Sequence, residues 1–459
     1  MHISARVFKK LQAITGKPYC KIEKEDLACY AYDAITRDVF PDVVVFPENT
    51  GEVSEILTLA SREKIPVVPR GSGTGTTGGS LALSGGIVLV MTRMNRIIHI
   101  DRDNFVARVE PGVITGDLHN AVEAVGLFYP PDPSSASFST LGGNVAECAG
   151  GPRAVKYGVT RDYVLGLTAV LATGEVIKTG VQTAKGVVGY DLTRLIIGSE
   201  GTLAVVTEMT LKLLPLPGAV MTVAVVFDSM DKAAFTVTEI IRSGIIPRCV
   251  EYLDKASIAC VQSYANLDLP IGAEALLIIE TDGRRDAAEY DLRCLTEICR
   301  KNDCILIKTA ESKEEKDALW AARKAVSPSL YMYGPDKINE DIVVPRSRIP
   351  EMVKMIETLR KDSGLTMVSF GHAGDGNIHV NIMLDKGKKG DLEKAEYVVD
   401  RIFDETLSLG GTLSGEHGVG ITKLPYISKE IGQTERLLMQ QIKTVFDPHN
   451  ILNPGKIFG

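Results

Sequence analysis

The sequence has few of the features that mark a membrane protein or a metal-cluster protein. Its most apolar runs, such as GIVLVM and YVLGLTAVLA, are the length of a strand and fall short of the ~18–20 residues that span a bilayer. The eight cysteines lack the paired CxxC spacing of zinc and iron–sulfur sites. We therefore expect buried free thiols in a reducing compartment, no transmembrane segment and no cluster held by this chain.

The charge is mildly acidic. The formal net charge of the 459 residues is −7 at pH 7, which disfavours general binding to nucleic acid or to an anionic membrane. The N-terminal stretch MHISARVFKKLQAITG has no continuous apolar core and no small-residue cleavage site. We expect a weakly amphipathic helix there and no signal peptide, and hence a cytoplasmic protein.

Only seven histidines are present, and three of them lie in two short motifs that contain glycine. In FGHAGDGNIHVN, residues 370–381, β-branched and apolar segments flank His372 and His379, which predicts two strands joined by a tight turn. In SGEHGVG, Glu416 and His417 add a carboxylate and a third imidazole. Two histidines and one carboxylate form a recurrent divalent-metal site, for zinc, iron or manganese; the alternative is a set of unrelated polar loop residues.

A second glycine-rich segment, GSGTGTTGGS at residues 71–80, follows a predicted β-α-β unit. DVVVFP and IPVVPR predict strands that form a parallel pair, and GEVSEILTLASREK predicts the helix between them. The segment matches GxGxxG, but a loop and a strand follow where a nicotinamide-binding Rossmann fold needs a helix, and position 95 is Asn95 where that fold needs an acid. We predict a loop whose backbone N–H groups bind a pyrophosphate; the alternative is a flexible surface loop.

Two further regions complete the outline. Residues 129–160 lack periodicity and are dense in proline, glycine and serine, which predicts a long functional loop. Pro215 and Pro217 mark the predicted domain boundary. Beyond it, strands and helices alternate in a pattern that predicts a ferredoxin-like layer, with helices on one face of an antiparallel sheet.

Six motifs give the sequence a specific resemblance to a known family: PRGSGTGTTGG, PPDPSSASFSTLGGNVAECAGG, GSEGTLAVVTE, GHAGDGNIHVN, SGEHGVG and DPHNILNPGKIF. The chain resembles the FAD-linked 2-hydroxy-acid dehydrogenases, such as the FAD-binding subunit of glycolate oxidase and the D-lactate and D-2-hydroxyglutarate dehydrogenases. The resemblance implies an α+β protein with a vanillyl-alcohol-oxidase-type FAD-binding domain at residues 1–216. A ferredoxin-like cap domain with the metal hairpin would follow at 217–415, and a C-terminal segment, 416–459, would return to the FAD domain.

The same resemblance implies which residues bind FAD. Those around the pyrophosphate would be Pro69, Arg70, Gly71, Ser72, Gly73, Thr74, Gly75 and Thr76. Those lining the flavin would be Pro131, Asp132, Ser137, Gly142, Gly143, Asn144, Gly150 and Gly151. Those completing the site would be Glu200, Gly201, Val205 and Asn453, with Lys456 nearby. We expect non-covalent FAD because the glycine-rich loop contains neither histidine nor cysteine; the role of Cys148 is left open.

The resemblance also implies residues for the chemistry. The implied catalytic set is the base His417, Arg323 for the substrate carboxylate, Ser327 and Lys337 beside it, and Asn381 as a hydrogen-bond partner. The implied metal ligands are His372, His379 and Glu416. By pattern alone, Arg323 also fits a solvated surface arginine, and Asn381 fits the polar face of a half-buried strand.

The implied reaction is the FAD-dependent oxidation of a D-2-hydroxy acid, D-lactate or glycolate, to the 2-oxo acid by hydride transfer to flavin N5. The alternatives are D-2-hydroxyglutarate as substrate, a non-catalytic electron-transfer flavoprotein subunit, or a same-fold aldonolactone oxidase or ether-lipid synthase. Because the sequence has no haem or cluster motif, we expect an electron-accepting partner: an iron–sulfur subunit, an electron-transfer flavoprotein or a membrane carrier. A peripheral position at a membrane through such a partner and a homodimer are both left open.

Overall fold

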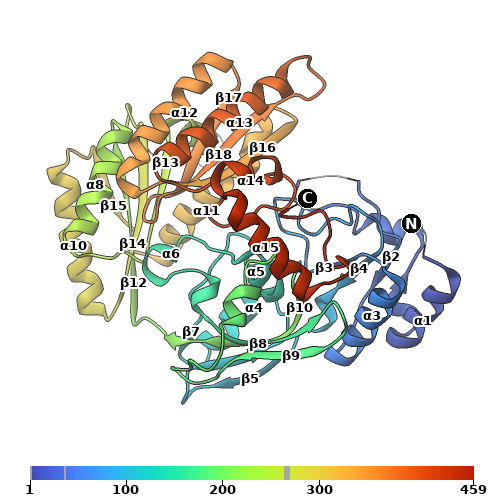
Figure 1. The fold of residues 1–459 in the computed structure, drawn as a ribbon. Coiled ribbons are helices and arrows are strands. Elements are labelled where there is room, and N and C mark those ends of the chain that lie inside the picture. The colour runs from blue at the N-terminus through green and yellow to red at the C-terminus, as the bar shows by residue number, and fades with distance from the viewer. Residues whose placement is uncertain (1–2, 36–37, 263–268, 459) are drawn as a thin grey trace. The chain divides into compact units, whose positions relative to one another are not determined.

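The computed structural model describes residues 3–35, 38–262 and 269–458, which fold into two compact units (Figure 1). Unit 1 consists of Met1–Gly150, Val159–Leu216 and Glu416–Gly459. Unit 2 consists of Gly151–Gly158 and Pro217–Gly415. The chain therefore enters unit 2 twice, first for eight residues and then for the long stretch that begins at Pro217.

Unit 1 begins with a four-stranded sheet of order β1-β2-β4-β3. Strands β2, β4 and β3 are parallel, and β1 is antiparallel to β2. The predicted direct pair of β2 and β3 is wrong, because β4, which follows the glycine-rich segment, lies between them. The elements are α1 Ala5–Thr15, η1 Lys17–Tyr19, β1 Cys20–Lys21, α2 Lys24–Ala28, β2 Val43–Val45, α3 Thr50–Glu63, β3 Val67–Arg70, β4 Ile87–Val90 and η2 Met91–Arg93.

Helices α1 and α3 provide apolar side chains for one core of unit 1. Val53, Ile56 and Leu57 of α3 are fully buried there, together with the β-branched residues of the parallel strands. Burying such a side chain contributes roughly 1.5–3 kcal/mol. The C-terminal tail joins this core, because the N–H of Val67 donates to the carbonyl of Ile451 at 2.7 Å. The tail is thus part of unit 1.

The second sheet of unit 1 is five-stranded and antiparallel, in the order β5-β6-β10-β8-β9. Strands β8 and β9 form a hairpin, with Gly174 in its turn at φ 92°. A further two-stranded sheet pairs β7 with β11. The elements are β5 Ile97–Asp101, β6 Val106–Val109, β7 Leu127–Phe128, β8 Val164–Leu171, β9 Val176–Gly180, α7 Leu192–Ile196, β10 Ala204–Lys212, β11 Leu214–Pro215, η6 Leu424–Tyr426, α14 Ile427–Glu430 and α15 Gln433–Phe446.

The region 129–160 contains helices where the sequence predicted one long loop. Thr140 caps a helix by accepting a hydrogen bond from the N–H of Gly143 at 3.3 Å. The two glycines at 142 and 143 lower helix propensity, which hides this helix from a propensity argument. The elements in and before this region are α4 Thr115–Glu123, α5 Leu141–Glu147, α6 Ala154–Tyr157 and η3 Thr160–Asp162.

Unit 2 is built on one antiparallel sheet of seven strands, in the order β15-β12-β14-β13-β17-β18-β16. Its first four strands have the order of a ferredoxin-like βαββαβ unit, as the sequence predicts. The elements are β12 Ala219–Phe227, α8 Met230–Arg242, β13 Cys249–Asp254, α9 Lys255–Gln262, β14 Ala275–Gly283, α10 Arg285–Lys301, β15 Leu306–Thr309, α11 Lys313–Ser329, η4 Leu330–Met332, β16 Asp336–Val343, η5 Arg346–Arg348, α12 Ile349–Ser363, β17 Thr366–His372, β18 Asn377–Leu384 and α13 Asp391–Ser408.

Helices cover both faces of this sheet, whereas the sequence predicted helices on one face. Adjacent strand residues point to opposite faces. On β14, the hydroxyl of Thr281 donates to Ala288 of α10 at 2.9 Å, while the carboxylate of its neighbour Glu280 accepts from Trp320 Nε1 of α11 at 2.8 Å. Helices α10 and α11 therefore lie on opposite faces, and α9 packs with α11 over the second face.

A buried carboxylate, Asp282, binds the segment Gly151–Gly158 to the sheet of unit 2. The side chain of Asp282 is fully buried and accepts from Lys156 Nζ at 2.5 Å and from the hydroxyl of Tyr157 at 2.7 Å. Arg248 Nη1 donates to the same carboxylate at 2.7 Å. Burial alone would raise the pKa of Asp282, but these three partners bring the pKa below its ordinary value.

Replacing Asp282 with asparagine is expected to destabilise the protein by about 1.5–3 kcal/mol at neutral pH, the usual worth of a hydrogen bond to a charged group. A carboxyl whose pKa is depressed by folding adds stability above its unfolded-state pKa, and that stability is lost as the pH falls through the folded-state value. The difference in denaturant unfolding between wild type and Asp282→Asn should therefore shrink below about pH 4. The exposed Asp286→Asn is the control, and a difference independent of pH would contradict the assignment.

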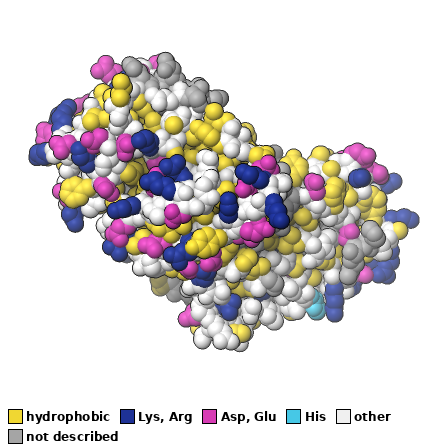
Figure 2. Space-filling model, turned by 90° about the horizontal axis from the view of Figure 1, so that it is seen from above, with side chains coloured by type: hydrophobic (Ala, Val, Ile, Leu, Met, Phe, Trp, Pro, Cys, Tyr) yellow, Lys and Arg dark blue, Asp and Glu magenta, His cyan; other side chains and the backbone are white. Residues whose placement is uncertain are grey.

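No helix of residues 3–35, 38–262 and 269–458 combines the length and the apolar character needed to cross a membrane. On the face shown in Figure 2, basic and acidic side chains are interspersed. This mixture agrees with a formal net charge of −7 spread over 459 residues.

Candidate active site

The histidine motif of residues 370–381 folds as the hairpin β17–β18, as its alternating apolar pattern predicts. In the register of the two strands, His372 faces Asn377 and His379 faces Phe370. The turn residue Gly376 has φ 93°, and a Cβ there would collide with the carbonyl of Val344. Glycine is required at this position, because its backbone conformation and the close approach both exclude a side chain.

The two imidazoles of the hairpin meet on one face of the sheet. His372 and His379 are diagonal neighbours across the strand pair, and their Nε2 atoms are 3.4 Å apart. The rings are perpendicular, at 89°, and both side chains are buried. Two imidazole nitrogens directed at each other in this way can share a metal ion or a proton.

Glu251 on β13 supports His372. The register places Glu251 opposite His372, and its Oε1 contacts His372 Nδ1. Burial alone would raise the pKa of Glu251, but His372 and Arg323 lower it below its ordinary value. A carboxylate that binds one ring nitrogen orients the other toward a metal, a recurrent arrangement in metalloproteins. The sequence did not predict Glu251, because β13 itself was missed.

Asp341 on β16 lies beside His379, at ion-pair distance. The register places Asp341 opposite His379, and Oδ1 lies 3.6 Å from Nδ1 of that imidazole. The carboxylate is fully buried and also accepts from Asn377 Nδ2 at 2.6 Å and from the N–H of Gly415 at 3.0 Å. The sequence did not predict a role for Asp341 either. It is one of two adjacent acidic residues in INEDIVVP, a pattern that is typical of a half-exposed strand.

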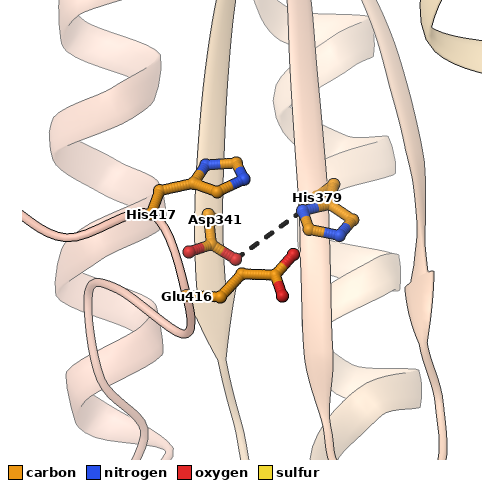
Figure 3. Close-up of side chains that lie close together, drawn as sticks. All are labelled: Asp341, His379, Glu416 and His417. Carbon is orange, nitrogen blue, oxygen red and sulfur yellow. Dashed lines mark ion pairs between the residues drawn. The ribbon is translucent and has the colours of Figure 1, made fainter. Parts of the chain in front are cut away.

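Four side chains bring potential ligand atoms within 4.8 Å of one another: Asp341, His379, Glu416 and His417 (Figure 3). Glu416 and His417 directly follow Gly415, the last residue of unit 2. The set contains two imidazoles and two carboxylates, donors that suit zinc, iron or manganese. Of the predicted ligands, His379 and Glu416 belong to it, whereas His372 lies next to it, 3.4 Å from His379.

Replacing Glu251 with glutamine is expected to weaken the binding of a divalent metal about 10–100-fold, the usual effect of losing such a supporting carboxylate. Titration of metal-free protein with Zn²⁺ or Mn²⁺ measures this. The matched control is Glu289→Gln, which removes a glutamate from the exposed side of α10. An unchanged metal affinity in folded Glu251→Gln protein would show that His372 is not oriented toward a metal.

Arg323, the predicted anchor for a substrate carboxylate, lies on α11 and is 8% exposed. Its Nε and Nη2 both lie 2.7 Å from Glu251 Oε2, and its guanidinium lies 4.6 Å from the ring centre of Phe370. The surface-arginine alternative is therefore wrong. One turn further on α11, Ser327 Oγ accepts a hydrogen bond from Lys337 Nζ at 2.9 Å, and burial lowers the pKa of Lys337.

Asn381 is fully buried, and neither polar atom of its side chain has a hydrogen-bond partner. It faces Asn339 across β18 and β16, and Oδ1 of Asn339 also lacks a partner. An unpaired buried amide costs about 1–3 kcal/mol, so native proteins retain one where a ligand or water completes it. The carbonyl and amino groups of Asn381 are therefore available to a polar ligand.

In unit 1, the glycine-rich loop is shaped by close approaches. A Cβ at Gly71 would collide with Thr140 Oγ1, and one at Gly73, which has φ 70°, would collide with the guanidinium of Arg70. Arg70 itself is buried and donates from Nη2 to the carbonyl of Tyr32 at 2.7 Å. The hydroxyl of Thr76 is buried without a partner, which fits a phosphate oxygen as its acceptor.

The structure places the predicted flavin-lining residues in several settings. Asn144 is buried and donates to Thr115 Oγ1 at 2.7 Å, and the carbonyl of Pro131 contacts His119 Nε2 at 2.9 Å. Gly150 belongs to unit 1, whereas Gly151 is the first residue of the excursion into unit 2. The residues that lie in unit 1 are Pro69, Arg70, Gly71, Ser72, Gly73, Thr74, Gly75, Thr76, Pro131, Asp132, Ser137, Gly142, Gly143, Asn144, Gly150, Glu200, Gly201, Val205 and Asn453.

Among the residues predicted to complete the cofactor site, Val205 and Asn453 make contacts within unit 1. Val205 is part of the hydrophobic core. Asn453 Nδ2 donates to the carbonyls of Gly79 and Glu200, each at 2.8 Å. Burial lowers the pKa of Lys456 to about 8. Asn453 thus closes the glycine-rich loop against the tail.

Cys148, whose role was left open, is buried, and Arg161 Nε lies 3.3 Å from its sulfur. All eight cysteines are free thiols, as the sequence predicts, but the prediction that they are buried is wrong for Cys29, which is exposed, and for Cys294 and Cys304, which are half-buried.

Two family models match the chain. The model "FAD binding domain" matches residues 41–180, and "FAD linked oxidases, C-terminal domain" matches residues 216–457. Glycolate oxidase subunit GlcD of Bacillus subtilis (strain 168) is 47% identical over 94% of this chain and 92% of its own length. D-lactate dehydrogenase of Anaerostipes hadrus is 36% identical over 91% of this chain and 89% of its own length.

Solved structures share the fold. A p-cresol methylhydroxylase with bound substrate superposes with a TM-score of 0.80 at 18% identity, covering 98% of this chain and 96% of that one. An alkyldihydroxyacetonephosphate synthase superposes with a TM-score of 0.77 at 21% identity, covering 99% of this chain and 86% of that one. The α+β, vanillyl-alcohol-oxidase-type fold that the sequence predicts is confirmed. The chain belongs to the FAD-linked oxidase family, with an FAD-binding domain followed by the C-terminal domain of that family.

Proposed function

We propose that this protein oxidises a D-2-hydroxy acid to the 2-oxo acid with non-covalent FAD as the electron acceptor. The observation that carries the proposal is the cluster of Asp341, His379, Glu416 and His417, which brings metal-ligand atoms and an imidazole that can act as a base within 4.8 Å of one another. The names of the relatives, glycolate oxidase subunit and D-lactate dehydrogenase, support glycolate or D-lactate as the substrate. D-2-hydroxyglutarate is the alternative.

Each residue has a proposed task. Arg323, with Lys337 and Ser327, binds the substrate carboxylate, since a guanidinium pairs well with a planar anion. The side-chain amide of Asn381, which has no hydrogen-bond partner in the structure, donates a hydrogen bond to a substrate oxygen. His417 removes the proton of the hydroxyl group, a role for which imidazole is suited near neutral pH. His372, His379 and Glu416 would hold a divalent metal, and Asp341 would support His379. When bound, the metal supplies positive charge that lowers the pKa of a hydroxyl, and FAD supplies the acceptor for the hydride.

We propose that unit 1 holds the FAD. The close-packed glycine-rich loop and the unpartnered Thr76 hydroxyl support a pyrophosphate there, and the family model for FAD binding matches this part of the chain. Reduced flavin must be reoxidised. The word "subunit" in the name of the Bacillus subtilis relative supports a partner protein as the acceptor, an iron–sulfur subunit or an electron-transfer flavoprotein.

Anaerobic mixing with a panel of 2-hydroxy acids tests the proposal. D-lactate or glycolate is expected to bleach the flavin absorbance, and L-lactate is expected to leave it unchanged. Bleaching by D-2-hydroxyglutarate alone would replace the proposed substrate with the alternative. A flavin that no 2-hydroxy acid reduces would indicate a non-catalytic flavoprotein.

A further inference from the structure

The carboxylate of Glu200 holds the backbone that follows His417. Its Oε1 accepts from the N–H of Val419 at 2.7 Å, and its Oε2 accepts from the N–H of Gly420 at 2.7 Å. Charge-assisted hydrogen bonds of this length are about twice as strong as neutral ones. One side chain therefore fixes two successive peptide groups immediately after the proposed base.

Thr77 holds the same segment from its other side. Its hydroxyl donates to the carbonyl of His417 at 3.2 Å, and its own carbonyl accepts from the N–H of Ile421 at 2.8 Å. The carbonyl of His417 and the three N–H groups that follow Gly418 thus all have partners from these two residues. The peptide that carries the imidazole is held on both sides within unit 1.

The two glycines of the segment permit this close fit. Gly418 has φ 79°, and a Cβ there would collide with Oε2 of Glu147 and Oε1 of Glu200. Gly420 has φ 50°, and a Cβ there would collide with the carbonyl of Thr77. The segment could not approach Glu200 and Thr77 so closely with any other residue at these positions.

Glu200 is itself held rigidly. It is 5% exposed, its N–H donates to the carbonyl of Ala146 at 2.8 Å, and its carbonyl accepts from Asn453 Nδ2 at 2.8 Å. Its φ of 51° is unusual for a residue with a side chain. Such strain persists only where the surroundings fix the conformation, and it clusters at functional sites.

We infer that Glu200 is a positioning residue for His417: it fixes the backbone of the base through Val419 and Gly420. This differs from the role in the cofactor site that the family resemblance implies for Glu200. The inference rests on the proposed function, in which His417 takes the hydroxyl proton. It predicts that losing the Glu200 carboxylate acts through His417 and leaves the flavin bound.

Glu200→Gln tests the inference, because glutamine keeps the shape but presents an amino group to one of the two N–H donors. Flavin reduction at saturating substrate is expected to slow about 10²-fold, the effect of a misplaced catalytic group. Flavin content and the visible spectrum should stay as in the wild type. The matched control is Glu208→Gln, a partly exposed glutamate of β10 that pairs with Arg108 at 2.7 Å and should leave the rate unchanged.

The decisive comparison is the double variant His417→Ala with Glu200→Gln. If Glu200 acts through His417, the double variant reduces its flavin no more slowly than His417→Ala alone. A further 100-fold loss in the double variant, a wild-type rate in Glu200→Gln or a loss of bound flavin would each overturn the inference. A wild-type rate in His417→Ala would instead overturn the proposed role of the base, so the two failures are distinguishable.

If Glu200→Gln does not fold, Thr77→Val provides a second test. It removes only the hydroxyl that donates to the carbonyl of His417 and keeps the shape of the side chain. Flavin reduction should slow about fivefold, the worth of one hydrogen bond, and this loss should also vanish in the His417→Ala background. A fivefold loss that persists without His417 would contradict the positioning of the base.

Discussion

Replacing His417 with alanine is expected to slow the reduction of the flavin by a 2-hydroxy acid about 10²–10⁴-fold, the usual effect of removing a general base. The imidazole is the member of the cluster of Asp341, His379, Glu416 and His417 that we assign to proton removal. Without it, the hydroxyl proton must leave to water as hydride leaves C2. Stopped-flow measurement of flavin absorbance under anaerobic conditions gives the rate.

The control for this experiment is His99→Ala, which removes an exposed histidine from β5. It should reduce its flavin at the wild-type rate. His417→Ala should retain its flavin, because the imidazole is not part of the proposed FAD loop. If His417→Ala is reduced as fast as the wild type, another group takes the proton and the proposed mechanism is wrong.

Replacing Arg323 with methionine is expected to have the largest effect on stability, about 3–5 kcal/mol, because it removes the guanidinium from a buried carboxylate and leaves only His372 beside that group. Arg323 Nε and Nη2 both contact Oε2 of Glu251, whose side chain is fully buried. Substrate binding should weaken as well, since the same guanidinium is the proposed anchor for the carboxylate. Equilibrium denaturation measures the first effect, and the substrate dependence of flavin bleaching measures the second.

Lys324→Met is the matched control for Arg323→Met, because it removes the exposed cation next to it on α11. An exposed substitution of this kind changes stability by about 0.5 kcal/mol or less. A folded Arg323→Met protein with wild-type stability and wild-type substrate dependence would show that Arg323 neither pairs with Glu251 in solution nor binds the substrate.

Local patterns in the sequence predicted the elements that hold the site. The period-two alternation around His372 and His379, with glycine at the turn, predicted the hairpin because a half-buried strand pair needs that pattern. Glu416 and His417 could be named because their neighbours are glycines. These features depend on residues close together in the chain.

The supporting carboxylates could not be predicted in the same way. Glu251 and Asp341 come from strands far from the hairpin in sequence, and only the sheet register brings them opposite His372 and His379. The available signal for Glu251 was a single acid inside the apolar run CVEYL, which is unusual for a buried strand. The order of the parallel strands could not be predicted from local patterns either, because β4, which follows the glycine-rich loop in sequence, lies between β2 and β3.

Figure 3 shows the geometry on which the proposed oxidation depends: the proposed base His417 and a set of metal-ligand atoms within one small cluster. The most direct test is anaerobic stopped-flow reduction of the flavin by D-lactate and by D-lactate deuterated at C2. We expect D-lactate to bleach the flavin in a single enzyme turnover and the deuterated acid to do so more slowly, because the C2–H bond breaks in that step. A flavin that D-lactate and glycolate leave oxidised would contradict the proposal that this protein oxidises a D-2-hydroxy acid with FAD.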